Sequence, residues 1–191
     1  LLSGPTSGGS FRPIADGDTS PIGTDDGRDF GNRLINQTTT RTFRIINTGN
    51  EPLTLSNARF QGTGSDGFSV ADLPVDPAPA ITVDPGEVHF FDISFRPLSL
   101  GSHFPVSFFL DNNDAIENPY NFVIQGTGIA SEIEVQGNST TIADGSTTAS
   151  TADDTDFGSS TVGTEVLHTF TISNTGASTL TLSLPITLSN S

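Results

Sequence analysis

Five aspartates lie close together near the start of the chain, in a loop that is also rich in glycine: Asp16, Asp18, Asp25, Asp26 and Asp29. Ca²⁺ takes six to eight hard oxygen ligands, and clustered carboxylates beside glycine turns can provide them. The five side chains are therefore a candidate calcium site. They do not form an EF-hand, because the third ligand pair and the bidentate glutamate of that loop are missing. The alternative is a solvated acidic loop in which the aspartates cap turns.

A second acidic run, Asp111-Asn112-Asn113-Asp114 with Glu117 after it, is similar in miniature to the calcium-binding linkers of cadherin-like repeats. It lies between two predicted strands of one domain, however, and not between domains. Asn and Asp favour tight turns because their side chains bond to nearby backbone groups. A hairpin turn is therefore the favoured interpretation.

The residue types that usually carry catalysis are present without the spacing that catalysis needs. His89, His103 and His168 come from separate segments, and surface or edge positions are expected for them. No Gly-x-Ser-x-Gly nucleophile elbow occurs. Paired carboxylates can cleave glycosides, but Trp is absent and Tyr120 is the only Tyr, so no aromatic-lined sugar cleft is predicted. We expect a protein that is not an enzyme, with no catalytic residue and no cofactor other than the candidate calcium ion.

The charge of the chain argues against two classes of partner. The formal net charge is −15, and all seven basic residues are Arg. A field of this sign repels the phosphates of nucleic acids and of anionic lipids. No run approaches the 18 apolar residues of a membrane-spanning helix, and Cys is absent, so no disulfide is possible. The chain starts at Leu1 without a signal-peptide pattern, which is typical of a mature or internal fragment.

The chain also repeats itself over a long distance. Three segments return 127 residues later in the same order: Asp29–Gly31 as Asp156–Gly158, Thr42–Gly49 as Thr169–Gly176 with some substitutions, and Leu53–Ser56 as Leu180–Ser183. Two earlier segments return with an offset of 128 residues: Ile14–Gly17 as Ile142–Gly145, and Asp25-Asp26 as Asp153-Asp154. The change of offset places one gained or lost residue between Asp26 and Asp29. A repeat of this length indicates a domain-sized module.

The second copy keeps four of the five aspartates of the acidic loop and has Ser146 in place of Asp18. The four that remain are Asp144, Asp153, Asp154 and Asp156.

Short alternating or β-branched runs, separated by turn signals about every ten residues, predict an all-β sandwich. We expect strands near residues 30–36, 41–47, 52–61, 67–73, 87–96, 103–110 and 119–127. Seven short strands fit an immunoglobulin-like fold. At Phe90-Phe91 the apolar pattern changes face, which predicts a bulge or a strand buried on both faces.

Apolar side chains that alternate with polar ones should point into the core of this sandwich. Those expected to be largely buried are Phe43, Ile45, Phe95, Phe108 and Phe122. Those expected to share one inner face of the 103–110 strand are Phe104, Val106, Phe108 and Leu110.

Three regions are expected along the chain. Residues 1–13 are rich in Gly, Ser and Pro and are predicted to be a connector. Residues 14–128 are predicted to form one seven-stranded immunoglobulin-like β-sandwich. Residues 129–191 are predicted to be the first half of a second copy, so the expected fold is a tandem repeat with an incomplete second member.

An ordered series of motifs identifies a family. The series is Ile14–Asp18, Asp29–Gly31, Phe43–Gly49, Leu53-x-Leu55, Asp84–Gly86, Phe95-x-Pro97, Gly101, Asn113-Asp114, Asn118–Tyr120 and Gly126–Gly128. It resembles the choice-of-anchor D repeats of bacterial surface proteins, which are relatives of the ASPM/SPD-2/Hydin immunoglobulin-like domains. The resemblance covers residues 14–128 fully and 129–191 as a first half. It implies a seven-stranded sandwich, secretion, tandem arrays and a structural or adhesive role, and it supplies no catalytic motif.

We therefore expect a non-catalytic structural or adhesive module of a secreted bacterial surface protein or extracellular fibre, located outside the cell or on its surface. The alternatives are a calcium-binding or glycan-binding module and an accessory spacer domain of a larger secreted enzyme. Half a sandwich leaves an apolar face and open strand edges. Either strands of a neighbouring copy or further strands of a longer protein would complete it. The expected partners are further copies of the same module, with no nucleic acid and no membrane span.

Overall fold

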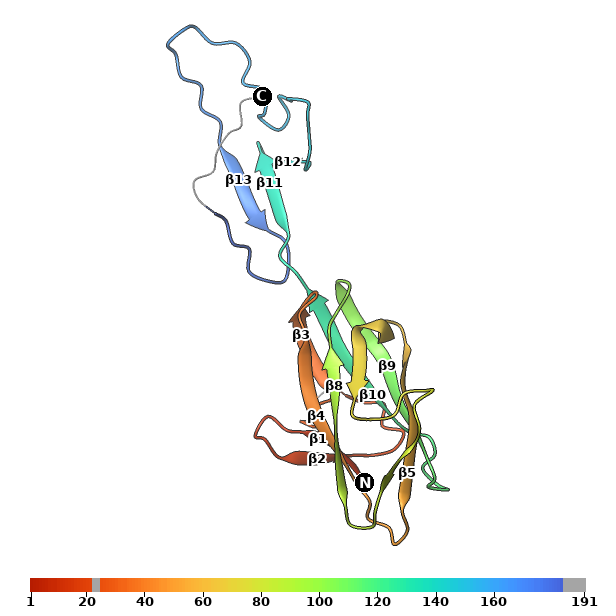
Figure 1. Cartoon of the computed structure of the whole chain (residues 1–191). Helices are drawn as coiled ribbons and strands as arrows, with labels where there is room; N and C mark the ends of the chain where they lie inside the picture. The colour runs from red at the N-terminus through yellow and green to blue at the C-terminus, as the bar shows by residue number, and fades with distance from the viewer. Residues whose placement is uncertain (22–24, 184–191) are drawn as a thin grey trace. The chain divides into compact units, whose positions relative to one another are not determined.

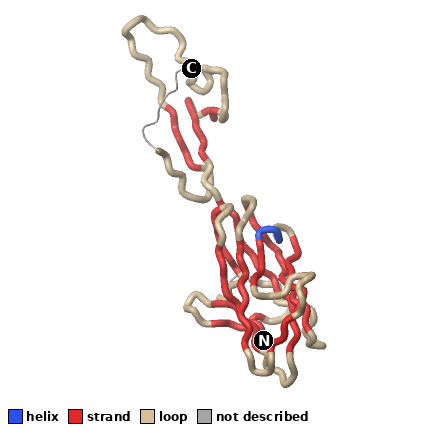
Figure 2. Tube along the Cα trace, viewed as in Figure 1, coloured by secondary structure: helices blue, strands red, loops and turns tan. Residues whose placement is uncertain are grey.

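The structure is a computed structural model that describes residues 1–21 and 25–183. It divides into two compact units, Leu1–Ile129 and Ala130–Ser191, which we call unit 1 and unit 2 and describe separately. Strands dominate unit 1, whereas loops make up most of unit 2 around a few short strands (Figure 2), and one turn of 3₁₀ helix, η1 (Ser65–Gly67), is the only helix in the described residues. None of the helical structure in these ranges is long and apolar enough to cross a membrane. The predicted all-β class is confirmed.

Unit 1 is a sandwich of two five-stranded sheets (Figure 1). The first has the order β2-β1-β4-β8-β6, with β1 (Leu2–Pro5), β2 (Phe11–Ile14), β4 (Thr39–Ile46), β6 (Phe68–Ala71) and β8 (Val88–Phe95). The second has the order β3-β10-β9-β5-β7, with β3 (Asp29–Leu34), β5 (Leu53–Gly62), β7 (Ile81–Val83), β9 (Gly101–Asn112) and β10 (Tyr120–Ile129). Neighbouring strands are antiparallel except β3 and β10, which run parallel.

All seven predicted strands are present, as β3 to β6 and β8 to β10. The sequence does not predict β1, β2 or the short β7. The connector expected over residues 1–13 is wrong, because β1 pairs with β2 and with β4, and Leu2 and Ile14 are both buried. Residues 1–13 therefore belong to the sandwich of unit 1.

Aromatic side chains join the two sheets of unit 1. Phe43, Ile45, Phe95, Phe108 and Phe122 are all buried, as predicted, and none is more than 4% exposed. The ring of Phe43 in the first sheet lies 6.3 Å from the ring of Phe122 in the second sheet. Ring pairs at such distances stabilise a core beyond the area that they bury.

The inner face of β9 changes at a β-bulge. The pairing of β9 with β10 leaves one extra residue on β9 between His103 and Val106. An extra residue reverses the alternation of side chains. His103 is therefore buried against the edge of the Phe95 ring, whereas Phe104 is 42% exposed. The expected inward position of Phe104 and the expected surface position of His103 are both wrong.

Strand β8 pairs with β4 in a continuous register, so the bulge expected at Phe90-Phe91 is absent. Phe91 and Ile93 point inward and are buried, while Phe90 points outward and is about half exposed. The ring of Phe11 covers part of Phe90, with the ring centroids 6.0 Å apart. The apolar pattern changes face because Phe90 is an outward-pointing aromatic that Phe11 partly covers. The strand is not buried on both faces.

Unit 2 contains one sheet over its described residues, in the order β12-β11-β13. The strands are β11 (Ile133–Gly137), β12 (Thr140–Ile142) and β13 (Phe170–Asn174). β11 pairs with β12 and β13 in the register with which β1 pairs with β2 and β4. The equivalent triplets are Leu2, Ile14 and Ile45 in unit 1 and Val135, Ile142 and Ile172 in unit 2.

Candidate functional site

The acidic loop of unit 1 surrounds a buried arginine. The side chain of Arg28 is 0% exposed, and its Nη2 lies 2.8 Å from Asp18 Oδ2 and 2.9 Å from Asp26 Oδ2. Its Nε also donates to Asp26 Oδ2 at 2.9 Å. A buried ion is stable only with close partners of opposite charge and satisfied hydrogen bonds. The guanidinium thus takes the position of a cation between two of the five predicted ligands.

The ionisation of this cluster follows from its contacts. Burial alone would lower the pKa of Arg28, but the hydrogen bonds and charges of Asp26 and Asp18 outweigh burial and raise it. Burial alone would raise the pKa of Asp18. The hydrogen bonds from the Ser20 N–H and from Arg28 outweigh that effect, so the pKa of Asp18 is lowered. Asp18 and Arg28 are therefore both charged at neutral pH.

The other three predicted ligands each accept a hydrogen bond from a backbone N–H group: Asp16 from Asn121 at 2.8 Å, Asp25 from Ser7 at 2.8 Å, and Asp29 from Gly31 at 2.8 Å. The Asp29 bond is a local turn cap, as the alternative interpretation expects, whereas the bonds of Asp16 and Asp25 join segments far apart in the chain. Over residues 1–21 and 25–183, no three acidic or histidine side chains are grouped as a metal ion requires. Calcium binding by the five aspartates stays a prediction, and Arg28 is the residue of this cluster that the acidic pattern of the sequence does not predict.

The same loop in unit 2 lacks the arginine. Thr155 stands at the position of Arg28, and its N–H donates to Asp153 Oδ1 at 3.1 Å. In unit 1 the N–H of Arg28 donates to Asp26 Oδ1 at 3.2 Å. Asp26 therefore corresponds to Asp153, with an offset of 127, and the expected match with Asp154 is wrong. The gained or lost residue lies before Asp26, and the ion cluster is not repeated.

The second acidic run spans the end of β9 and the loop that leads to the antiparallel β10, so the predicted hairpin turn is confirmed. Asn112 Oδ1 accepts the N–H of Asp114 at 2.7 Å and holds the turn. Asp111 bonds to Arg59 at 2.7 Å and to Asn57 at 2.7 Å. Burial alone would raise the pKa of Asp111, but these two bonds outweigh it and lower that pKa.

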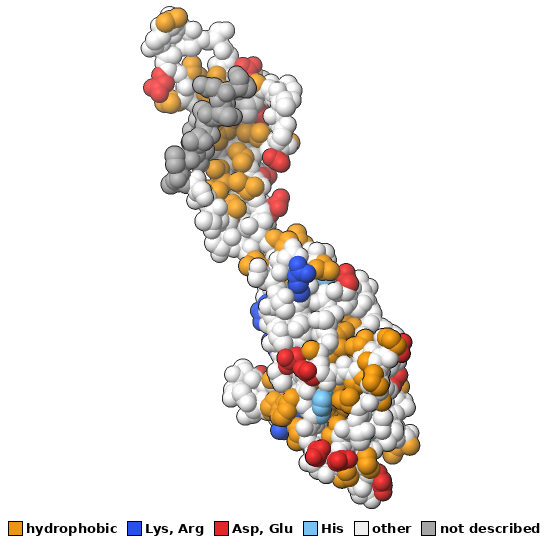
Figure 3. All heavy atoms as spheres, in the orientation of Figure 1, with side chains coloured by type: hydrophobic (Ala, Val, Ile, Leu, Met, Phe, Trp, Pro, Cys, Tyr) orange, Lys and Arg blue, Asp and Glu red, His pale blue; other side chains and the backbone are white. Residues whose placement is uncertain are grey.

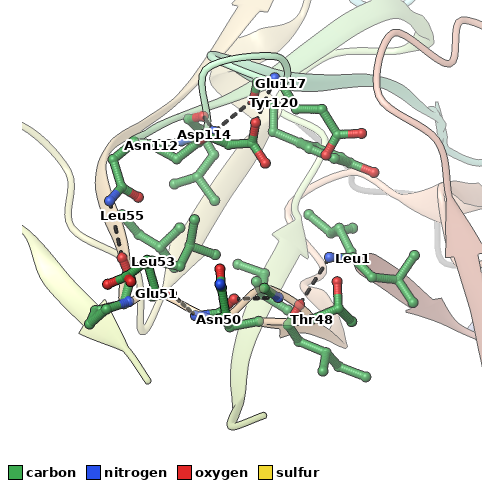
Figure 4. A pocket seen from close by; sticks show the side chains of 18 residues that line it. Leu1, Thr48, Asn50, Glu51, Leu53, Leu55, Asn112, Asp114, Glu117 and Tyr120 are labelled. Atoms are coloured by element: carbon green, nitrogen blue, oxygen red, sulfur yellow. Dashed lines mark hydrogen bonds between the residues drawn. The ribbon is translucent and has the colours of Figure 1, made fainter. Parts of the chain in front are cut away.

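Unit 1 has a cavity of about 260 Å³, and Figure 4 shows the side chains that line it. Two turns form its walls, residues 47–52 between β4 and β5 and residues 112–119 between β9 and β10. Side-chain amides brace both turns: Asn47 donates to Glu51 O at 2.8 Å, and Asn113 donates to Pro52 O at 3.0 Å. The walls therefore have a defined shape.

The lining of this cavity divides by polarity. Buried apolar side chains line its inner part: Leu2, Leu55, Leu110 and Tyr120. Carboxylates stand nearer the solvent: Glu51, Asp114 and Glu117. The Tyr120 hydroxyl donates to the carbonyl of Ile14, and burial raises the pKa of Tyr120, so this group stays a protonated donor. Such a cavity can bind an apolar group beside polar backbone, and it offers no pair of nucleophile and base.

Unit 2 exposes the side chains that correspond to the core of unit 1. Phe170 and Ile172 are each 39% exposed, whereas their equivalents Phe43 and Ile45 are 0% and 4% exposed. Figure 3 shows hydrophobic side chains gathered in unit 2. Among residues 130–183, β13 is also an edge strand, while its equivalent β4 lies between β1 and β8. An apolar face beside an open strand edge is typical of an interaction surface.

A family of known proteins has this architecture. Residues 24–127 match the family model described as HYDIN/CFA65/VesB-like, Ig-like domain. The chain is also similar to the solved ASH/PapD-like domain of human CEP192 (PapD-like domain 7), with 13% identity and a TM-score of 0.35, covering 64% of this chain and 98% of that chain. No curated protein matches. Immunoglobulin-like families of this kind are generally non-catalytic and are typically structural or interaction modules. The chain belongs to the HYDIN/CFA65/VesB-like family of immunoglobulin-like domains.

Proposed function

We propose that the chain is a non-catalytic structural or adhesive part of a secreted bacterial surface protein or extracellular fibre, built from such modules in series. The family supports a structural or interaction role. The motif series between Ile14 and Gly128 supports the narrower choice-of-anchor D type, and a strongly acidic surface keeps an exposed protein soluble. Within the described ranges, no specific contact favours a calcium-binding, glycan-binding or enzyme-spacer role instead.

The observation that carries the proposal is the exposed face of β13. In unit 1, β8 pairs with β4, and Phe108 of β9 and Phe122 of β10 belong to the core that covers Phe43. In unit 2 the equivalents of Phe43 and Ile45 remain exposed at the corresponding positions. Strands of the β8, β9 and β10 type fit this surface by edge pairing and by apolar packing. In the 191-residue chain, another copy of the module can supply such strands, as further residues of a longer protein can.

Charge makes such an association dependent on salt. Unit 2 contains neither Arg nor Lys, and its acidic residues are Glu132, Glu134, Asp144, Asp153, Asp154, Asp156 and Glu165. Two acidic copies repel each other at low ionic strength, and salt screens that repulsion between exposed charges. Association between copies should therefore strengthen as the salt concentration rises.

Sedimentation velocity of the full chain over a range of concentrations tests the proposal. We expect association that grows with protein and salt concentration and is lost in Ile172→Asp. Thr171→Asp is the matched control, because Thr171 is the exposed neighbour on the opposite face of β13. Head-to-tail strand exchange does not close, so the species should lengthen with concentration and not stop at a dimer. A chain that stays monomeric, or that loses association equally in both variants, would contradict the proposal.

A further inference from the structure

One wall of the cavity of unit 1, the turn after β4, has a counterpart in unit 2 that binds a neighbouring segment. There the segment Ala130–Glu132, which leads into β11, crosses the turn that follows β13. Its carbonyl oxygens accept three backbone hydrogen bonds: Glu132 O from Thr175 N at 2.8 Å, and Ala130 O from Ala177 N at 2.9 Å and from Ser178 N at 3.1 Å. The N–H of Glu132 donates in turn to Asn174 Oδ1 at 3.2 Å. The extended segment is therefore bound along the whole turn.

The equivalent turn of unit 1, residues 47–51, has the same internal geometry. The side chain of the leading asparagine donates to the carbonyl four residues on, at 2.8 Å from Asn47 and 2.7 Å from Asn174. It also accepts the N–H of the following glycine, at 3.0 Å in unit 1 and 3.1 Å in unit 2. The two turns are thus the same structure in two places.

The donors that bind the segment in unit 2 have no such partner in unit 1. The equivalents of Thr175, Ala177 and Ser178 are Thr48, Asn50 and Glu51. Their N–H groups make no hydrogen bond within the part of the chain that the structure describes, and all three residues are exposed and line the cavity. Figure 4 shows this turn at the edge of the cavity.

A glycine in the turn carries a second, independent sign of an occupant. A Cβ on Gly176 would lie 2.5 Å from Ala130 O and 2.5 Å from Glu132 N, so only glycine lets the segment approach. Among the described residues, a Cβ on Gly49 would meet only Asn47 Oδ1 within 4 Å, at 3.2 Å. Neither glycine has a positive φ, so the backbone conformation does not require glycine. Unit 1 thus has the same glycine cradle, and none of residues 1–21 and 25–183 lies in it.

The strand register shows which side chain would enter the cavity. Leu2 occupies the position of Val135, so a residue placed directly ahead of Leu1 occupies the position of Ile133. Alternate residues of a strand point to the same face. That residue therefore points to the side of Leu2, which is buried and lines the cavity.

We infer that the cavity of unit 1 is a receiving site for an extended peptide of the Ala130–Ile133 type, bound as an N-terminal continuation of β1. Its carbonyl groups accept the N–H groups of Thr48, Asn50 and Glu51. Its apolar tip fills the inner part of the cavity beside Leu2. The inference deepens the proposed arrangement of modules in series, since it identifies the contact by which one module receives the segment ahead of it.

The test is amide hydrogen exchange on the full chain with Ala-Ser-Glu-Ile, the sequence of residues 130–133, added ahead of Leu1. In the extended chain we expect the amides of Thr48, Asn50 and Glu51 to exchange at least about tenfold more slowly than in the unextended chain. Thr175, Ala177 and Ser178 serve as the internal reference, because they already donate to such a segment in both chains.

Two matched chains separate this site from a general effect of a longer N-terminus. An extension that ends in Asp in place of Ile should give no protection, because a carboxylate would enter the apolar part of the cavity. Gly49→Ala in the extended chain should also abolish protection, since its Cβ occupies the path of the segment. Unchanged exchange in the Ala-Ser-Glu-Ile chain, or equal protection in either control, would overturn the inference. Such a result leaves the proposed function standing, because that is tested separately at Ile172.

Discussion

The imidazole of His168 stacks on the ring of Phe157, with the ring centroids 4.2 Å apart, and its Nδ1 bonds to the carbonyl of Asp154. In unit 1 the equivalent side chain is that of Arg41, which lies 4.8 Å over the Phe30 ring. Its Nη1 donates to the carbonyl of Gly27 at 2.7 Å. Two different residue types thus make equivalent contacts in the two units, each between the acidic loop and the aromatic ring that follows it.

Arg41→His should therefore destabilise unit 1 less than Arg41→Ala does. We expect Arg41→Ala to lower the free energy of unfolding by about 1–3 kcal/mol, because the carbonyls of Gly27 and Asp29 both lose a donor. An imidazole can keep one of these bonds and the ring contact, as His168 does. Urea denaturation of both variants measures the difference. Equal losses of stability in the two variants would show that an imidazole at position 41 does not replace the contacts of the guanidinium.

Arg28→Ala should be among the most destabilising changes in unit 1. The variant leaves Asp26, whose side chain is 3% exposed, as a buried charge without its partner. Breaking a buried pair in this way costs about 3–5 kcal/mol. Arg12→Ala is the control, because Arg12 is exposed and its loss should change stability by no more than about 0.5 kcal/mol. Chemical denaturation that gives similar values for both variants would contradict the structural role of Arg28.

The sequence predicts most of the fold because the central strands have clear apolar alternation, as in Phe43 and Ile45. It does not predict β1, since Leu2-Ser3-Gly4-Pro5 has the composition of a linker. Glycine is needed in that strand because a Cβ on Gly4 would collide with the carbonyl of Asp26. The second copy could not reveal β1 by an ungapped comparison. Leu2 pairs with Ile14, and Val135 pairs with Ile142, but the number of residues between the two partners differs in the two units.

The candidate site is less accessible to sequence reasoning. Five aspartates in one loop indicate a cation, but they do not show that the cation is Arg28 of the same loop. Only the tertiary fold places Asp18 and Asp26 on either side of that guanidinium. The cavity and its glycine cradle likewise depend on contacts between turns far apart in the chain. A lone arginine within an acidic loop is the one signal that could have indicated a buried ion pair.

The bulge in β9 predicts different effects for two phenylalanines four residues apart. Phe108→Ala should cost about 3–5 kcal/mol, because it empties space in a fully buried aromatic cluster. Phe104→Ala should cost much less, since its side chain points outward beyond the bulge. Thermal or urea unfolding of the two variants provides the comparison. A larger loss of stability for Phe104→Ala would contradict the bulge, because it would show that Phe104 points into the core as regular alternation predicts.

Acid should destabilise unit 1 through Asp18. The pKa of this carboxyl is lowered in the folded chain from an ordinary value of 3.8. The folded state therefore binds this proton less tightly than the unfolded state does. Its contribution to stability is present above pH 3.8 and is lost as the pH falls below that value, through the folded pKa.

Unfolding measured at a series of pH values down to about pH 2 should show this loss. In Asp18→Asn, stability should fall less as the pH is lowered. A smaller fall should remain, because the pKa values of Asp25 and Asp111 are also lowered. An identical pH dependence in the parent chain and in Asp18→Asn would show that the contact with Arg28 does not hold the carboxylate ionised.

Unit 2 is built as the first half of unit 1, and methyl NOE spectroscopy on the full chain tests this equivalence most directly. Side chains directly opposite each other on paired strands lie close enough for such contacts. Leu2 should show cross-peaks to Ile14 and Ile45, and Val135 should show the equivalent cross-peaks to both Ile142 and Ile172. Cross-peaks for Leu2 with none for Val135 would contradict the account.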